Sequence, residues 1–167
     1  MITRRTLLKL TGAALGASAA SLRSAVAAIA DPARTALDQS SVVYISPLKK
    51  DSSESTCHAE VWFVFDGGDL FVVTSAKAWR ATAITRGLTR ARLWVGEFGE
   101  WKKAKEAYRT APELIATAAK IDDAEIHARM LEHFGEKYRV EWLYYGPKFR
   151  DGLKDGSRVM LRYTPTA

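Results

Sequence analysis

The sequence predicts a small, mostly antiparallel β-barrel with helices packed outside it, a mainly β fold of the α+β class. The chain has 167 residues, of which 47% are hydrophobic, and this suits one compact domain with its own core. Short β-branched and aromatic runs are separated by turn signals, as in antiparallel sheets. The expected order is three strands, a helix, a strand, a segment that fits strand or helix, a helix and a final strand. Because strands and helices do not alternate strictly, a parallel sheet is disfavoured.

The first 30 residues have the features of an export signal. They combine a basic start, a mildly apolar stretch rich in Ala and Gly, and an A-x-A cleavage pattern at Ala28-Ile29-Ala30. The stretch 10–20 is too short and too weakly apolar to span a bilayer. Arg4 and Arg5, followed by two leucines and a lysine, resemble a twin-arginine signal read by the twin-arginine export machinery. The alternative is an ordinary secretory signal with two adjacent arginines. We therefore expect a periplasmic protein cleaved near Ala30.

Charge and cysteine content exclude two classes of protein. The formal net charge is +6, but four basic residues and no acidic residue lie within residues 1–30, so the remainder carries +2. Such a balance gives no strongly basic surface, and we expect no nucleic acid partner. Cys57 is the single cysteine, which excludes an intrachain disulfide framework.

The first half of the mature chain is expected to form a strand followed by a hairpin. Asp31–Ser41 fits a linker or an N-terminal helical turn, and the barrel domain is expected to cover residues 42–167. Val42–Pro47 has the β-branched and aromatic composition of a strand, and a polar loop follows. Cys57–Phe65 and Leu70–Val73 are two apolar runs that bracket the sequence DGGD. Asp-Gly and Gly-Gly pairs supply the positive φ angles of tight turns, so these runs predict an antiparallel hairpin.

The second half contains the predicted helices. We expect a short helix capped by Ser75 and stopped by Gly87, and a longer helix with an acidic start stopped by Gly135. Pro112–Ile121 fits either helix or strand, and 98–110 fits a hairpin excursion or a helical turn. The short helix is expected over residues 76–86 and the longer one over 122–134, with helical turns continuing through 138–153. Strands are expected over 90–97 and 157–163.

The end of the predicted hairpin suggests an anion site. Thr74 and Ser75 bring two hydroxyls to a helix start, where unpaired N–H groups and the helix dipole favour negative charge. Lys77 and Arg80 lie three residues apart on one helical face, within reach of a bound phosphate. The alternative is that Ser75 only caps the helix while Lys77 and Arg80 belong to a solvated surface.

Aromatic and histidine residues give weaker signals. Several aromatic side chains could border a flat ring, although their alternation on strands favours core packing; they are Trp62, Phe63, Phe65, Trp79 and Trp94. Cys57 and His58 are adjacent, but one cysteine and three scattered histidines form no ligand set of recognised spacing. We expect no metal site.

Residues 42–96 resemble the FMN-binding split-barrel superfamily, the pyridoxamine 5′-phosphate oxidase-like proteins. The resemblance rests on a first strand, a polar turn, a strand with an aromatic pair before an Asp-Gly turn, a strand ending in Thr or Ser, and a basic residue at the next helix. It implies a six-stranded antiparallel split β-barrel. It also implies that Thr74, Ser75, Lys77 and Arg80 hold a flavin phosphate. The resemblance further implies that the strand carrying Glu60, Val61 and Trp62 runs beside the isoalloxazine ring.

The resemblance implies an exported FMN-binding oxidoreductase or redox protein that forms a homodimer. The substrate and electron donor are not indicated, and no catalytic residue is, because a flavin carries the redox chemistry itself. The family motif continues from its basic residue with Arg-Asn-Leu, whereas Ala81-Thr82-Ala83 follows Arg80 here, which leaves a deazaflavin or haem open in place of FMN. The alternative from another class is a cofactor-free periplasmic module that binds a small ligand or a protein.

Overall fold

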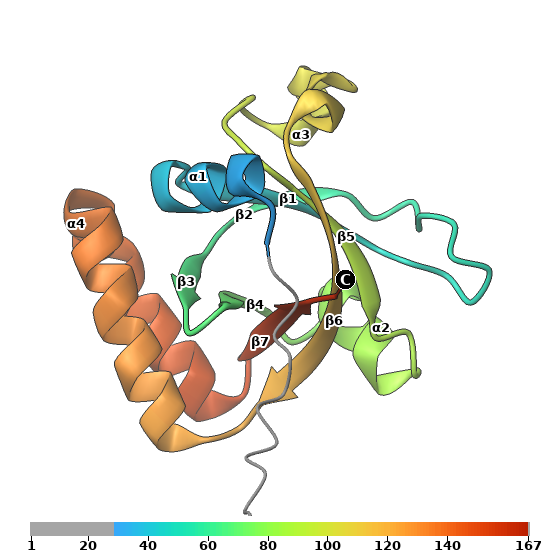
Figure 1. The fold of residues 1–167 in the computed structure, drawn as a ribbon. Helices are drawn as coiled ribbons and strands as arrows, with labels where there is room; N and C mark the ends of the chain where they lie inside the picture. The colour runs from blue at the N-terminus through green and yellow to red at the C-terminus, as the bar shows by residue number, and fades with distance from the viewer. Residues whose placement is uncertain (1–28, 167) are drawn as a thin grey trace, which may run out of the picture.

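A computed structural model describes residues 29–166, so all but the last two residues of the expected signal, 1–30, lie outside the described part. The fold is mainly β, with helices outside one continuous antiparallel sheet (Figure 1). The helical elements are α1 (Asp31–Gln39), α2 (Trp79–Thr85), α3 (Trp101–Ala104), the 3₁₀ helix η1 (Ala107–Thr110) and α4 (Ala124–Asp155). The strands are β1 (Val42–Pro47), β2 (Ala59–Trp62), β3 (Val64–Asp66), β4 (Asp69–Ser75), β5 (Arg90–Val95), β6 (Glu113–Ile121) and β7 (Arg158–Pro165).

The sheet curls into a nearly closed barrel. Its strand order is β2-β1-β5-β6-β7-β4-β3, with every neighbouring pair antiparallel. The two edge strands, β2 and β3, follow one another in the chain and are separated by a single residue, Phe63. The sheet has seven strands, so the expectation of six is wrong by one. The antiparallel barrel with outer helices is confirmed.

The extra strand arises because the predicted strand Cys57–Phe65 divides at Phe63. Before this residue the chain pairs with β1, and after it the chain pairs with β4. Phe63 itself pairs with neither strand. Its N–H donates to the Tyr138 hydroxyl at 2.9 Å, and its carbonyl oxygen lies 2.8 Å from the same hydroxyl. A side chain from α4 therefore satisfies the backbone at the point where the strand changes partners.

Several predicted elements are confirmed. Gly67 and Gly68 have φ angles of 59° and 94°, as the turn between β3 and β4 requires. The ambiguous segment Pro112–Ile121 forms strand β6, and the segment 98–110 forms α3 and η1. Of the two alternatives for residues 31–41, the structure has the helical one: α1 buries Leu37, whose exposed fraction is 1%, against the barrel.

Three apolar clusters organise the packing. The largest fills the barrel and includes Leu70, Val72 and Leu161. A second cluster lies between the outer face of β4 and β7 and helix α4, and a third, around Tyr44 and Trp94, lies beneath α3 and η1. Because side chains alternate along β4, Val72 faces the barrel while Val73 faces α4. The two faces of β4 thus belong to different environments.

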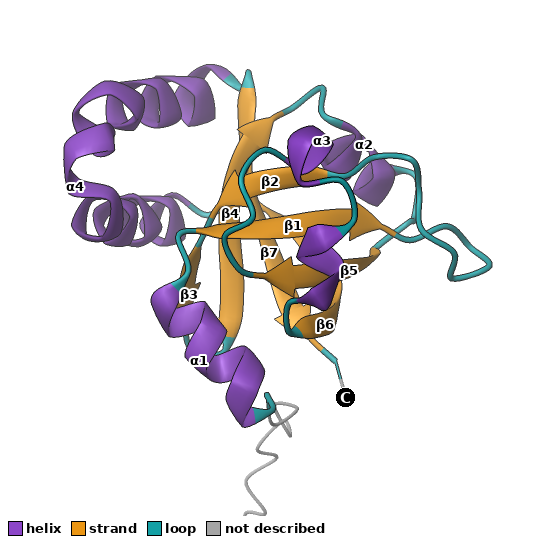
Figure 2. Cartoon of the chain, turned by 90° about the horizontal axis from the view of Figure 1, so that it is seen from above, coloured by secondary structure: helices purple, strands orange, loops and turns teal. Residues whose placement is uncertain are grey.

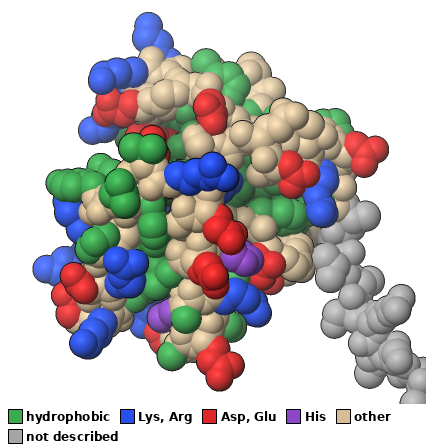
Figure 3. All heavy atoms as spheres, turned by 90° about the vertical axis from the view of Figure 1, so that its left-hand side faces the viewer, with side chains coloured by type: hydrophobic (Ala, Val, Ile, Leu, Met, Phe, Trp, Pro, Cys, Tyr) green, Lys and Arg blue, Asp and Glu red, His purple; other side chains and the backbone are tan. Residues whose placement is uncertain are grey.

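Helix α4 is two helical limbs folded at Arg139, whose φ and ψ of 16° and −78° are not helical (Figure 2). The prediction that Gly135 ends the first helix is wrong, since the helix runs through it. Gly135 and Gly146 instead leave room for Trp142: a Cβ at either glycine would lie within 3.0 Å of its indole ring. Four large hydrophobic side chains remain exposed on the second limb: Val140, Leu143, Tyr144 and Tyr145. Figure 3 looks onto the side of the molecule on which α4 lies and shows hydrophobic side chains among Lys and Arg there. Within residues 29–166, no helix combines the length and apolar character needed to cross a membrane.

Candidate functional site

The end of β4 separates the two predicted hydroxyls. Thr74 faces the barrel interior and is 4% exposed, whereas Ser75 lies on the other face and is exposed. Their partners on β7 are Val159 and Arg158 respectively. The two hydroxyls are adjacent in sequence, but the strand geometry directs them away from each other. They therefore do not converge on one ligand.

The prediction that Ser75 caps the following helix is wrong. The chain continues to pair with β7 through Ala76, whose N–H donates to the Ser157 carbonyl at 2.9 Å. A turn then precedes α2, which begins at Trp79 with Ala78 as its cap residue. The Ser75 hydroxyl instead accepts the Lys77 N–H at 3.3 Å. Lys77 is exposed and lies before the helix, so it does not share a helical face with Arg80.

Arg80 is the predicted residue with the environment of an anion ligand. Its Nη1 donates to the Thr74 hydroxyl at 2.5 Å, and its Nε is buried without a hydrogen-bond partner. Among residues 29–166, no carboxylate oxygen lies within 4.0 Å of its guanidinium. A partly buried cation without a counter-ion is unfavourable, and a bound anion would correct this.

A cavity of about 470 Å³ lies next to the start of α2. It is lined by Lys49, Ser55, Thr56, Cys57 and Trp79, the last of which directly precedes Arg80. Arg80 and Cys57 both influence Tyr163, whose pKa is raised chiefly by burial, with Arg80 opposing the increase. The guanidinium and the thiol therefore both lie within electrostatic range of this buried phenol.

Sequence reasoning did not assign Lys49, Ser55 or Thr56 to the site. They belong to the polar loop after β1, which folds back so that Leu48 forms a β-bridge with Glu54. Lys49 is exposed, and within residues 29–166 it too has no carboxylate within 4.0 Å. Nothing in the local sequence shows that this loop lies opposite α2, because the approach depends on the curvature of the sheet.

An ion-pair network fixes the same loop from its other side. The Glu54 carboxylate accepts two hydrogen bonds from Arg109, at 2.9 and 2.7 Å, and one from Arg92 at 3.2 Å. The hydrogen bonds from Arg109 hold the pKa of Glu54 below its ordinary value, although burial opposes the decrease. His58 lies 4.0 Å from the same carboxylate and 3.5 Å from the Tyr108 hydroxyl. The described residues contain no cluster of three or more potential metal ligands.

The three predicted residues on β2, Glu60, Val61 and Trp62, do not line the cavity of about 470 Å³. The Glu60 carboxylate accepts the Trp101 N–H at 3.1 Å, which holds the start of α3. Val61 packs towards the barrel core, while Trp62 stacks on Tyr138 with ring centroids 4.3 Å apart. A second cavity, of about 250 Å³, is lined by Val61, Trp62, Val73, Tyr145, Phe149 and Arg158. The structure brings Thr74 and Arg80 together, places Val61 and Trp62 at this second cavity, and leaves Ser75 and Lys77 exposed.

Comparisons with solved structures assign the fold. A pyridoxamine 5′-phosphate oxidase-like protein of Listeria innocua superposes with a TM-score of 0.54 at 16% identity, covering 82% of this chain and 93% of that one. The heme storage protein HutZ of Vibrio cholerae gives 0.52 at 15% identity, with coverage of 83% and 91%. An F420 reductase gives 0.50 at 15% identity, with coverage of 80% and 93%. The chain has the split-barrel fold of these proteins. No protein-family model and no curated protein sequence matches the chain.

Proposed function

We propose that this protein binds a flavin, FMN in the first place, through its phosphate at Arg80, and acts as an exported redox protein or oxidoreductase. The support at the level of the fold comes from neighbours that include a pyridoxamine 5′-phosphate oxidase-like protein and an F420 reductase. Export through the twin-arginine route and assembly as a homodimer belong to the same proposal. They rest on the N-terminal sequence and on the resemblance to the superfamily.

One observation carries the proposal: among residues 29–166 the guanidinium of Arg80 has no counter-ion and its buried Nε has no hydrogen-bond partner, while the preceding residue, Trp79, lines a cavity of about 470 Å³. A phosphate dianion would supply both the missing acceptor and the missing charge. Lys49, Ser55 and Thr56 line this cavity and provide a second cation and two hydroxyls. These residues fit the phosphate end of a flavin mononucleotide.

The residues of this chain would bind and orient the cofactor. Thr74 accepts a hydrogen bond from Arg80 and so directs the guanidinium, while Trp79 supplies an aromatic wall next to it. A bound flavin would supply the electron- or hydride-transfer chemistry. No acid or base of this chain needs to act in that exchange, and the proposal names no catalytic residue.

The visible spectrum of the protein expressed with its signal tests the cofactor. Bands of oxidised flavin, or their appearance after addition of FMN, would support the proposal. A haem or deazaflavin spectrum would show that the protein binds that cofactor in place of FMN. A colourless protein that fails to take up added FMN would refute flavin binding and favour the cofactor-free module.

Substitutions test the position of the site. Arg80→Ala should weaken FMN binding by about 1–3 kcal/mol, the scale of a hydrogen bond to a charged group. Thr74→Val should weaken it less, since the guanidinium would remain but lose its orientation, and Ser75→Ala should have little effect. Lys154→Ala, which removes one charge from the end of α4 beside a different cavity, is the control. Equal affinities of the Arg80 and Lys154 variants would place the phosphate elsewhere.

A further inference from the structure

The cavity of about 250 Å³ between the outer face of the sheet and α4 has aromatic walls and one cation. Its lining consists of Val61, Trp62, Val73, Tyr145, Phe149 and Arg158. The Tyr145 ring stands at 76° to the Trp62 ring, with centroids 5.0 Å apart, and the Phe149 ring centroid is 6.3 Å from that of Trp62. A flat ring placed in this cavity would therefore contact aromatic side chains from both the sheet and the helix.

Gly152 and Phe149 of α4 hold the side chain of Arg158 at this cavity. A Cβ at Gly152 would lie 2.6 Å from Cγ and 2.7 Å from Cδ of Arg158, so the arginine stem could not keep this position beside a larger residue. The guanidinium carbon lies 5.2 Å from the centre of the Phe149 ring. Arg158 is half-buried, and a helix contact and a ring direct it.

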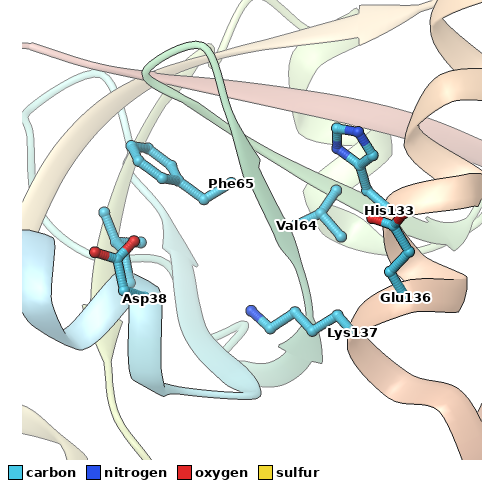
Figure 4. A pocket seen from close by; sticks show the side chains of 7 residues that line it. Asp38, Val64, Phe65, His133, Glu136 and Lys137 are labelled. Atoms are coloured by element: carbon cyan, nitrogen blue, oxygen red, sulfur yellow. The ribbon is translucent and has the colours of Figure 1, made fainter.

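The positive charge of Arg158 has no acidic partner in the described part of the chain. Within residues 29–166, no carboxylate oxygen lies within 4.0 Å of its guanidinium, and the guanidinium donates no hydrogen bond. The cavity of about 360 Å³ between α1, β3 and α4 differs in this respect, because Lys137 lies there with Asp38 and Glu136 (Figure 4). A ring contact uses the face of a guanidinium and leaves the N–H groups at its edge, which form a fork that matches a carboxylate.

This cavity and the Arg80 site lie on opposite faces of the sheet. Arg158 is the partner of Ser75 in the register of β4 and β7. Thr74, one residue earlier, faces the barrel interior and accepts the hydrogen bond from Arg80. Because side chains alternate along a strand, the two arginines serve different faces. A ligand at Arg158 therefore does not depend on the flavin proposed at Arg80.

We propose that this cavity binds a small aromatic carboxylate of one ring. The carboxylate accepts hydrogen bonds from the Arg158 guanidinium and supplies the missing negative charge. The ring of the ligand packs against Trp62, Tyr145 and Phe149 and buries apolar surface there. Pockets for drug-sized ligands usually have about 300–1,000 Å³, so a cavity of about 250 Å³ suits a smaller molecule.

Benzoate tests this proposal with the full-length protein. Isothermal titration calorimetry measures its affinity, and the Nε–H resonance of Arg158 in nitrogen-15 NMR spectra reports where it binds. We expect benzoate to bind at least about tenfold more tightly than benzamide, which keeps the ring without the charge, and than acetate, which keeps the charge without the ring. Benzoate that fails to bind at millimolar concentration, or that binds no more tightly than benzamide, would overturn the proposal.

Substitutions locate the carboxylate. Arg158→Gln should weaken benzoate binding at least about tenfold and remove the preference over benzamide. Arg158→Lys, which keeps the charge but not the fork, should restore part of the affinity. Arg150→Gln, at an exposed arginine of α4 outside this cavity, is the matched control and should leave the affinity unchanged. Circular dichroism checks that each variant is folded, and equal affinities of the Arg158→Gln and Arg150→Gln variants would overturn the proposal.

Two further measurements separate this cavity from the Arg80 site. Arg80→Gln should leave benzoate binding unchanged, because Arg80 acts on the other face of the sheet. FMN added to the wild-type protein should not displace benzoate. Loss of benzoate binding in the Arg80→Gln variant would place the carboxylate at Arg80, and displacement by FMN would place the flavin ring in this cavity; either result would overturn the proposal.

Discussion

Removal of one hydroxyl group should weaken the closure of the barrel. Tyr138 is 5% exposed, and its hydroxyl accepts the Phe63 N–H at 2.9 Å. The same hydroxyl lies 2.6 Å from the Ser41 carbonyl and 2.8 Å from the Phe63 carbonyl. Burial raises its pKa, which keeps it protonated at neutral pH. It therefore connects α4 to the residue before β1 and to the residue between the two edge strands of the sheet.

The size of the effect follows from these contacts. A hydroxyl has one proton, so it donates to one of the two carbonyl groups at a time while it accepts from Phe63. Tyr138→Phe keeps the ring stacked on Trp62 but leaves one buried N–H and one carbonyl without this partner. An unsatisfied buried polar group costs about 1–3 kcal/mol. We expect the free energy of unfolding to fall by about 2 kcal/mol, with little change in apolar packing.

Urea unfolding followed by circular dichroism measures this change, and a thermal midpoint lower by about 6 °C should accompany it. Tyr145→Phe is the matched control, since Tyr145 also contacts Trp62 from α4 but its hydroxyl makes no hydrogen bond within residues 29–166. That variant should be within about 0.5 kcal/mol of the wild type. A loss below about 0.5 kcal/mol for Tyr138→Phe would refute the role given to its hydroxyl.

Two further substitutions test the loop network and the fold of α4. Hydrogen bonds from Arg109 lower the pKa of Glu54 in the folded protein. The Glu54 carboxylate therefore stabilises the fold fully above the ordinary carboxyl pKa of about 4.3, and this stabilisation is lost as the pH falls through the lower pKa of the folded state. Glu54→Gln should therefore reduce stability at pH 7 by about 1–3 kcal/mol and flatten the acid limb of a stability–pH curve; an unchanged limb would contradict this. Gly146→Ala should destabilise by about 1–3 kcal/mol despite the better helix propensity of Ala, since its Cβ would lie 2.8 Å from the Trp142 ring. Urea unfolding and tryptophan fluorescence would measure this, and unchanged stability would show that the indole moves aside.

Local patterns predict the strands of this barrel well where a strand keeps the same neighbours along its whole length. The β3–β4 turn follows from two glycines, and the β5 and β7 segments follow from their apolar alternation. The division of the strand at Phe63 has no such signal. It depends on the hydroxyl of Tyr138, which lies 75 residues further along the chain. A sequence window cannot contain that contact, so six strands were expected where the structure has seven.

The glycines in α4 show a related limit of local patterns. Gly135 follows an apolar helical repeat, which is typical of a helix end. Here the missing Cβ makes room for Trp142 on the second limb, and the helix continues. A glycine can mark a turn or a close approach, and only the position of the second limb distinguishes these roles. The fold at Arg139 is equally unmarked by Gly or Pro.

Part of the candidate site could be predicted from the local sequence, and part depends on the three-dimensional arrangement of the strands and loops. Thr74 and Arg80 could be selected from sequence because the chemistry of an anion site needs a hydroxyl and a cation near a strand end. The hydrogen bond between them confirms that they are neighbours, yet Ser75 and Lys77, chosen by the same rule, lie elsewhere. Side chains alternate along β4, so Ser75 points to the opposite face of the sheet from Thr74. Lys77 lies in the three-residue turn between β4 and α2 and therefore not on the helix. The affinity for an anion bound at Arg80 is therefore expected to fall when Arg80 is replaced and to be insensitive to replacement of Lys77.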